Sequence, residues 1–213
     1  KDGPYHQAKV SDGLDQPGLS MAENMRRLAS VPLLSQPGTK WCYSLSIDVL
    51  GAVLEKAAGS SLSEIVHTRV AAPLAMTDTD FSLTQGSRNR LVTAYYDNPA
   101  RHSSNSTSSK ISDSKNNQSL EPLRMQALQL VPFDGGCFSF APARLFNKSS
   151  YPSGGAGLSG TAEDYLKLLE AIRTKDNKWL SRDSYKLMCT SQIGKLSMSP
   201  GGDWGFASGP AVL

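Results

Sequence analysis

Apolar residues recur at helical spacing in several stretches, and most of these stretches follow a residue that can cap a helix. Capping boxes, in which a serine or threonine precedes an acidic residue by three positions, open at Ser20, Ser61 and Thr161. They predict helices over residues 20–29, 61–71 and 161–173. A further helix is predicted around residues 181–189. The pattern therefore indicates a predominantly helical chain.

Residues 37–59 carry the most informative of these patterns. Pro37-Gly38 is typical of a type II turn, and Ser46 is the predicted N-cap of a helix that ends at Gly59. Apolar residues follow at helical spacing, and we expect them to form one buried face: Ile47, Leu50, Val53, Leu54 and Ala57. Tyr43 would then stand on a short loop before a buried helix, where a phenol can be either a packing residue or an acid–base group.

Strand signals are fewer. Residues 91–96 and 204–213 read as strands, and residues 137–140 as an extended segment. Residues 101–119 contain eight serines and almost nothing apolar, which predicts a solvated loop or a disordered insert. We expect an α+β chain in two parts. Residues 1–153 form a mostly helical part with the insert, and residues 154–213 hold the helix 161–173 and the terminal strand 204–213.

Composition narrows the classes of partner. The 213 residues carry a net charge of +3, which is too weak to indicate binding to nucleic acid or to a membrane surface. No apolar run is long enough to cross a bilayer. The three cysteines are widely spaced and include no Cys-x-x-Cys pair, so neither a zinc cluster nor a redox dithiol is expected. Unpaired thiols fit a reducing compartment, and we favour a cytoplasmic location.

One motif suggests a cofactor. Gly155-x-Gly157-x-x-Gly160 matches the dinucleotide-binding fingerprint, but that fingerprint requires a buried strand directly before it, and residues 147–152 are polar. We interpret the glycines as a tight turn that leads into a helix. The three histidines have no second histidine or cysteine at ligand spacing. We expect no cofactor and no metal.

The order and spacing of several short motifs resemble the serine β-lactamase-related hydrolases, over almost the whole chain except the serine-rich insert. This family comprises the class C-type β-lactamases, the DD-peptidases and the esterases built on the same fold. The motifs at residues 2–5 and 11–18 resemble the esterase branch most. The motifs that carry the family resemblance are Pro37-Gly38-Thr39, Tyr43-Ser44, Leu50-Gly51-x-x-Leu54-Glu55, Pro73-Leu74-x-Met76 and Gly154-Gly155-x-Gly157-Leu158-x-x-Thr161.

The resemblance implies acyl transfer through a serine. In the family, the serine of a Ser-x-x-Lys motif forms an acyl-enzyme, and the tyrosine of a Tyr-x-Asn motif shares proton transfer with the lysine. By this resemblance Tyr43 is that tyrosine. A free phenol has a pKa of about 10, and an adjacent lysine cation favours the phenolate. Leu45 stands where the family has asparagine, which favours simple esters over β-lactams. We expect Leu45 and Trp41 to line the pocket for the acyl or alcohol group.

The same resemblance implies that other parts of the mechanism lie outside these residues. The one Ser-x-x-Lys match, Ser112 to Lys115, lies in the serine-rich tract, and we interpret it as a consequence of composition. We expect the chain to be an internal fragment, inactive by itself: the helical lobe of a β-lactamase-like fold with part of its α/β lobe. It would act on a small-molecule ester together with the remaining segments of the same polypeptide. The alternatives are a β-lactamase or DD-peptidase, and a non-catalytic binding or scaffold protein.

Overall fold

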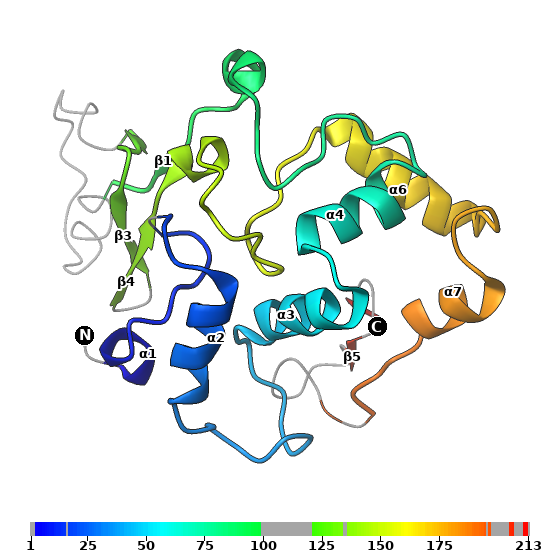
Figure 1. Cartoon of the computed structure of the whole chain (residues 1–213), viewed down its shortest axis with the longest axis horizontal. Helices are drawn as coiled ribbons and strands as arrows, with labels where there is room; N and C mark the ends of the chain where they lie inside the picture. The colour runs from blue at the N-terminus through cyan, green and yellow to red at the C-terminus, as the bar shows by residue number, and fades with distance from the viewer. Residues whose placement is uncertain are drawn as a thin grey trace, which may run out of the picture.

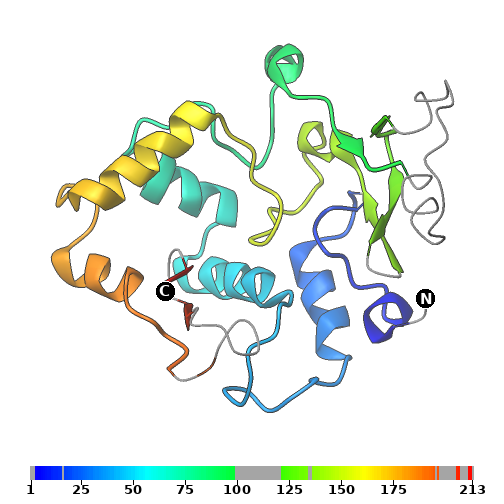
Figure 2. The ribbon, with the colours of Figure 1, turned by 180° about the vertical axis from the view of Figure 1, so that it is seen from behind.

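Helices and strands lie on different sides of the computed structural model, which describes residues 3–15, 17–98, 121–133, 136–194, 196, 205–206 and 211–212. The helices α3 (Ser46–Ala58), α4 (Leu62–Val66), α6 (Ala162–Thr174) and α7 (Arg182–Met188) lie on one side (Figure 1). The strands β1 (Tyr95–Tyr96), β3 (Gln129–Phe133) and β4 (Gly136–Phe140) lie on the other side with α1 (Pro4–Gln7). Helix α2 (Met21–Ala29) stands between the two groups. The view from behind shows the same division (Figure 2). The fold is α+β and predominantly helical, as predicted.

The starts of four helices follow the capping pattern. In each, the side-chain oxygen of the N-cap residue accepts a hydrogen bond of 3.2 Å from the backbone N–H three residues later, and these caps are Ser20, Ser61, Thr161 and Ser181. These bonds satisfy donors that would otherwise lack an intrahelical partner. After α4 the chain continues as one π-helical segment, His67–Ala71. The predicted helix starts are therefore confirmed.

The start of α3 differs from the prediction. Ser46 is the first residue of the helix and Leu45 occupies the N-cap position, so the prediction of Ser46 as the cap is wrong. The hydroxyl of Ser44 accepts a hydrogen bond of 3.2 Å from the Ser46 N–H instead. The turn before the helix is confirmed, since Gly38 has a φ of +77°. The helix ends as predicted, with Gly59 in the left-handed conformation.

The buried side of α3 is also different from the prediction. Asp48 and Gly51 are its buried residues, and a Cβ atom on Gly51 would lie only 3.0 Å from Leu62 Cδ2 of α4. The apolar face predicted to be buried is exposed: the exposed fractions of Ile47, Leu50, Val53 and Leu54 range from 40% to 56%, and Ala57 is exposed too. The apolar spacing identified this face correctly, but no described segment covers it.

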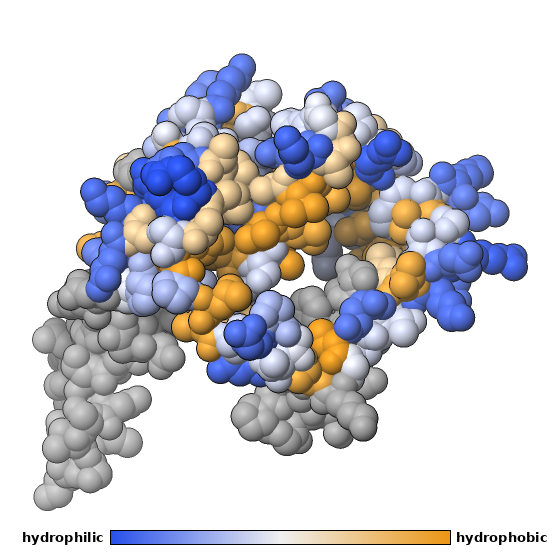
Figure 3. All heavy atoms as spheres, turned by 60° about the horizontal axis from the view of Figure 1, so that its bottom comes forward, coloured by the Kyte–Doolittle hydropathy of each residue, from blue (hydrophilic) through white to orange (hydrophobic). Residues whose placement is uncertain are grey.

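Hydrophobic side chains gather across the middle of the face that comes forward when the bottom of Figure 1 is turned toward the viewer (Figure 3). Helix α6 shows the same behaviour as α3. Its buried residues are Asp164 and Ala171, whereas the apolar residues Tyr165 and Leu169, four positions apart on one side of the helix, are exposed.

The described strands form three antiparallel pairs. β1 (Tyr95–Tyr96) pairs with β2 (Leu123–Arg124), β3 (Gln129–Phe133) with β4 (Gly136–Phe140), and β5 (Gly205–Phe206) with β6 (Ala211–Val212). The strand predicted over 91–96 is shorter than expected, and the extended segment 137–140 is confirmed. The stretch 204–213 contains two short paired strands. Short 3-10 helices occupy Gln85–Arg90 and Pro142–Phe146. The serine-rich tract 101–119 lies outside the described residues.

The largest fully buried side chains among the described residues are polar: Asn24, Asp48, Ser153 and Asp164. Asn24 shows how a polar side chain can be buried here, because its amide forms hydrogen bonds with two segments that are distant in sequence. It accepts a hydrogen bond of 2.9 Å from the Ser11 N–H and donates to the Ser11 carbonyl and the Tyr151 hydroxyl at 3.0 and 3.1 Å. Buried polar groups are stable when they are paired in this way. Within the described part of the chain, no helix is both long and apolar enough to cross a membrane.

Candidate active site

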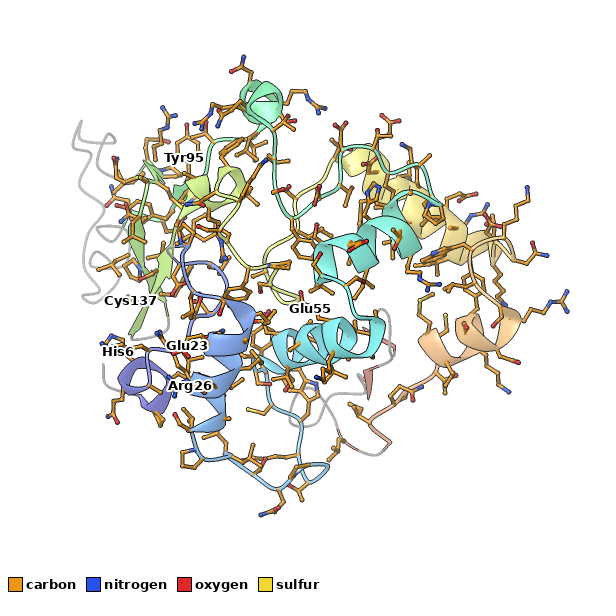
Figure 4. All side chains as sticks on the ribbon, viewed as in Figure 1. His6, Glu23, Arg26, Glu55, Tyr95 and Cys137 are labelled. Carbon is orange, nitrogen blue, oxygen red and sulfur yellow. The ribbon has the colours of Figure 1, made fainter. Side chains whose placement is uncertain are left out.

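A cleft of about 580 Å³ opens where four parts of the chain meet. Its walls come from residues 5–15, from residues 43–48 at the start of α3, from the β3–β4 hairpin and from residues 155–156. His6 on α1 and Cys137 at the start of β4, both labelled in Figure 4, belong to this lining. The cleft therefore collects side chains that are more than a hundred residues apart in sequence.

Tyr43 lies at the edge of this cleft. Its side chain is 88% exposed, and it is one of the lining residues. Its ring lies 6.5 Å from that of Trp41, centroid to centroid, at an interplanar angle of 58°. No described residue forms a hydrogen bond with the phenol oxygen. The loop before α3 therefore carries an accessible phenol, and its role in catalysis stays a prediction.

The two residues predicted to line a substrate pocket differ in position. Leu45 lines the cleft together with Ile47, so an apolar surface adjoins Tyr43. Trp41 does not belong to the described lining of this cleft, and its ring packs against Tyr43 instead. The structure thus brings Leu45 and Tyr43 together and leaves Trp41 next to the tyrosine. Their roles in binding a substrate stay predictions.

Asp48 connects the start of α3 to the glycine-rich segment. Its Oδ1 atom accepts a hydrogen bond of 2.7 Å from the Ser153 hydroxyl and a longer one, 3.4 Å, from the Gly155 N–H. The Ser153 oxygen in turn accepts a bond of 3.2 Å from the Ala156 N–H. The other carboxylate oxygen, Oδ2, is buried and forms no hydrogen bond with a described residue. The glycine-rich segment therefore leads into a capped helix, as predicted, and also forms one wall of the cleft.

The N-terminal wall of the cleft also contacts Ser153. Gly13 has a φ of +82°, and a Cβ atom there would lie 2.3 Å from the Ser153 oxygen. The position requires glycine for both reasons, since other residues rarely adopt this backbone conformation. Ser153 is thus in contact with residues from three of the walls.

The N-terminal wall is acidic. Burial raises the pKa of Asp12, and the nearby Asp15 carboxylate adds to this effect, while a hydrogen bond of 3.0 Å from the Leu14 N–H opposes it. The Ser11 hydroxyl donates a hydrogen bond to Asp15. Burial disfavours the charged form of a carboxyl group, as does a neighbouring negative charge. Asp12 consequently keeps its proton to a higher pH than a free aspartate.

Sequence reasoning missed the residues that hold the cleft together. Asp48, Ser153 and Gly13 carried no site prediction. The glycines at 155, 157 and 160 were interpreted only as a tight turn that leads into a helix, and that interpretation did not indicate which segment packs against them. No group of three or more metal-ligating side chains occurs within the described residues. Ser112 and Lys115 lie outside them.

Comparisons with known proteins agree in one family. The family model described as Beta-lactamase matches residues 2–210. Esterase EstB of Burkholderia gladioli is 37% identical over 212 residues, which is 98% of this chain and 48% of that protein. The solved structure of EstCE1, a hydrolase with promiscuous acyltransferase activity, superposes with a TM-score of 0.75 at 36% identity, over 99% of this chain and 50% of that one.

A more distant structure shows the same fold. The octameric penicillin-binding protein homologue from Pyrococcus abyssi has a TM-score of 0.61 at 16% identity, over 99% of this chain and 40% of that one. At this identity the likeness concerns the fold and not the activity. This chain spans about half the length of the relatives that it matches.

Proposed function

This chain belongs to the β-lactamase family, and on that premise we propose that it forms part of a serine ester hydrolase. Support comes from the relatives of 36–37% identity, which are named as an esterase and as a hydrolase and match almost the whole of this chain. The observation that carries the proposal is the position of Tyr43. Its phenol is exposed at the edge of a cleft that is partly apolar, where a proton can pass between a nucleophile and a leaving group.

The reaction would pass through an acyl-enzyme. A serine from another part of the full-length protein attacks the ester carbonyl, and its Oγ–H proton passes to a base formed by a lysine and Tyr43. The ester C–O bond then breaks, and the alcohol leaves with a proton from the same pair. Water attacks the acyl-enzyme, and the acid is released as the serine regains its proton. The 213-residue chain would supply the tyrosine and part of the pocket, and would be inactive by itself.

Small carboxylic esters suit the described part of the cleft. Leu45 replaces the amide that the family uses for β-lactam and peptide substrates, and Leu14 and Leu130 add apolar surface to the lining. An ester with a short alkyl chain loses little hydrogen bonding on entering such a site, whereas an amide would leave polar groups unpaired.

The exposed face of α3 would be covered by the remaining segments of the same polypeptide. Monomeric soluble proteins rarely expose a large contiguous apolar patch, yet five large apolar side chains of α3 are at least 40% exposed. Figure 3 shows the hydrophobic side chains that gather on this side of the molecule. The relatives are about twice as long as this chain, so they contain enough additional sequence to bury such a face.

The function is tested by hydrolysis of p-nitrophenyl butyrate with the full-length protein, with nitrocefin as the β-lactam comparison. Tyr43→Phe removes only the hydroxyl, and we expect kcat to fall by about 10²–10⁴-fold, the usual contribution of a general acid–base group. Tyr95→Phe is the matched control, because Tyr95 is also exposed but belongs to β1, outside the described lining of the cleft (Figure 4).

The outcomes separate the alternatives. Ester hydrolysis that survives Tyr43→Phe unchanged would remove Tyr43 from the mechanism. Turnover of nitrocefin in place of the ester would indicate a β-lactamase. A folded full-length protein that turns over neither substrate would favour a non-catalytic binding or scaffold protein.

A further inference from the structure

The side chains of Asp48 and Ser153 form a buried hydrogen bond beside the cleft, between residues 105 positions apart in sequence. We infer that this pair positions the loop that carries Tyr43, so that the phenol is held at the edge of the cleft. This role goes beyond the proposed function and rests on it. Neither side chain is assigned contact with the substrate: both act through the backbone that they hold.

Several close contacts make the junction rigid. The first turn of α3 touches the glycine-rich segment directly, since a Cβ atom on Gly154 would lie 2.6 Å from the Ile47 carbonyl oxygen. Gly13 contacts the Ser153 side chain from the N-terminal wall. The Ser153 hydroxyl therefore sits where three walls meet, and its donor and acceptor functions are both in use. Removing it would loosen all three walls at one point.

The energetics of Asp48 indicate a purpose other than stability. Asp48 is 1% exposed, and within the described part of the chain its Oδ2 has no hydrogen-bond partner. Burying a carboxylate is unfavourable unless its oxygens are paired, and apolar side chains often stabilise such a position better. Unsatisfied buried polar groups in native proteins are few and call for an explanation. Positioning of the neighbouring loop provides one.

Asp164 in α6 supplies an internal comparison. It is also the third residue of a 13-residue helix and is 2% exposed. Both of its oxygens are paired: Oδ2 accepts from the Asp78 N–H and the Thr79 hydroxyl, and Oδ1 from Lys167. Asp164 does not belong to the described lining of the cleft. It is thus a buried helix-start aspartate with a structural role, against which Asp48 can be measured.

The link from Asp48 to Tyr43 is short. Tyr43 and Asp48 are five positions apart. The phenol itself forms no hydrogen bond with a described residue, so its position depends on the backbone of residues 43–48. That backbone is held at Asp48 by Ser153. A displacement of about 1 Å of a reacting group can lower a rate by about 10²-fold. Loss of the Asp48–Ser153 hydrogen bond should therefore lower kcat more than it weakens substrate binding.

The test uses the full-length protein and p-nitrophenyl butyrate, with kcat and KM measured at a temperature where every variant is folded. We expect Ser153→Ala and Asp48→Ala each to lower kcat by about 10–100-fold with KM changed less than about threefold. Asp48→Asn keeps an oxygen that can accept the Ser153 and Gly155 hydrogen bonds, and should retain kcat within about threefold of the parent. The double variant Asp48→Ala with Ser153→Ala should be no slower than the slower of the two single variants, because both substitutions remove the same contact.

Asp164→Ala is the control: it should lower the melting temperature but leave kcat within about twofold of the parent. The inference is overturned if Ser153→Ala keeps kcat within twofold, or if Asp164→Ala lowers kcat as much as Asp48→Ala. It is also overturned if Asp48→Asn, folded, loses as much kcat as Asp48→Ala, because charge and not the hydrogen bond would then matter. A parent protein without ester hydrolysis refutes the proposed function before any variant is compared.

Discussion

Two adjacent glycines beside the cleft should respond in opposite ways to the same substitution. A Cβ atom on Gly154 would lie 2.6 Å from the carbonyl oxygen of Ile47 and 3.2 Å from its carbonyl carbon. On Gly155 the nearest described atoms would be Asp48 Oδ2 at 3.8 Å and the Ser153 oxygen at 4.0 Å. The first contact is with backbone that cannot rotate away, and the second is an ordinary van der Waals contact.

The expected magnitudes follow from these distances. Gly154→Ala forces the segment away from α3 by roughly 0.8 Å before ordinary contact is restored, and overpacking of this kind costs about 1–3 kcal/mol. Gly155→Ala meets no obstacle, and the loss of freedom in the unfolded chain should stabilise the protein by about 0.4–1 kcal/mol. The two variants should therefore differ by about 2 kcal/mol in the free energy of unfolding.

Urea unfolding of the parent and both variants, followed by circular dichroism, measures this difference. We expect the midpoint of Gly154→Ala to fall below that of the parent and the midpoint of Gly155→Ala to equal or exceed it. If Gly154→Ala proved as stable as Gly155→Ala, the close approach of the glycine-rich segment to Ile47 would be refuted, and with it the rigidity ascribed to the junction.

Three further predictions concern stability. If the remaining segments cover the α3 face, Val53→Lys should lower the unfolding free energy of the full-length protein by at least about 1 kcal/mol. Val92→Lys, at a side chain that is 82% exposed, should not lower it, and equal effects of the two variants in thermal unfolding would argue against a covered face. Burial raises the pKa of the Tyr151 phenol to about 12, so its protonated form stabilises the folded protein fully below about pH 10, the pKa of a free phenol, and this contribution is lost as the pH rises toward 12. In urea titrations the unfolding free energy of Tyr151→Phe should therefore fall less steeply with pH over this range than that of the parent, and an equally steep fall would contradict this. Ser20→Ala should cost about 1 kcal/mol by removing a cap, and Ser46→Ala, at a position the structure places inside the helix, only a few tenths; the reverse order in urea would restore Ser46 as the cap.

Helix starts could be predicted from the sequence because capping is local. Ser20, Ser61 and Thr161 each bond to a backbone N–H three residues later, so the evidence for each cap lies within four residues. Strand pairing is not local in this sense. The hairpin of β3 and β4 was only half anticipated, since Pro132 argues against a strand and its pairing with Cys137 becomes visible only in the structure.

The candidate site was predicted only where a motif names a residue. Tyr43 and Leu45 were found through the family resemblance, and both line the cleft. Periodicity showed which face of α3 is apolar but not what covers it, so the prediction that this face is buried was wrong for the described structure. The Asp48–Ser153 bond could not be predicted, because it joins two unremarkable residues 105 positions apart.

The separation of Asp48 and Ser153 in sequence affects how the protein folds while it is being synthesised. A ribosome that adds about 5–20 residues per second needs some 5–20 seconds to travel from Asp48 to Ser153, and Tyr151 must likewise wait for synthesis before it reaches Asn24, 127 positions earlier. Until then Asp48 lacks its hydrogen bond from Ser153, and Asn24 has only its bonds to Ser11. Long-range contacts of this kind slow folding, so the nascent chain passes through a period in which α2 and α3 have been synthesised but the segments that complete the cleft have not.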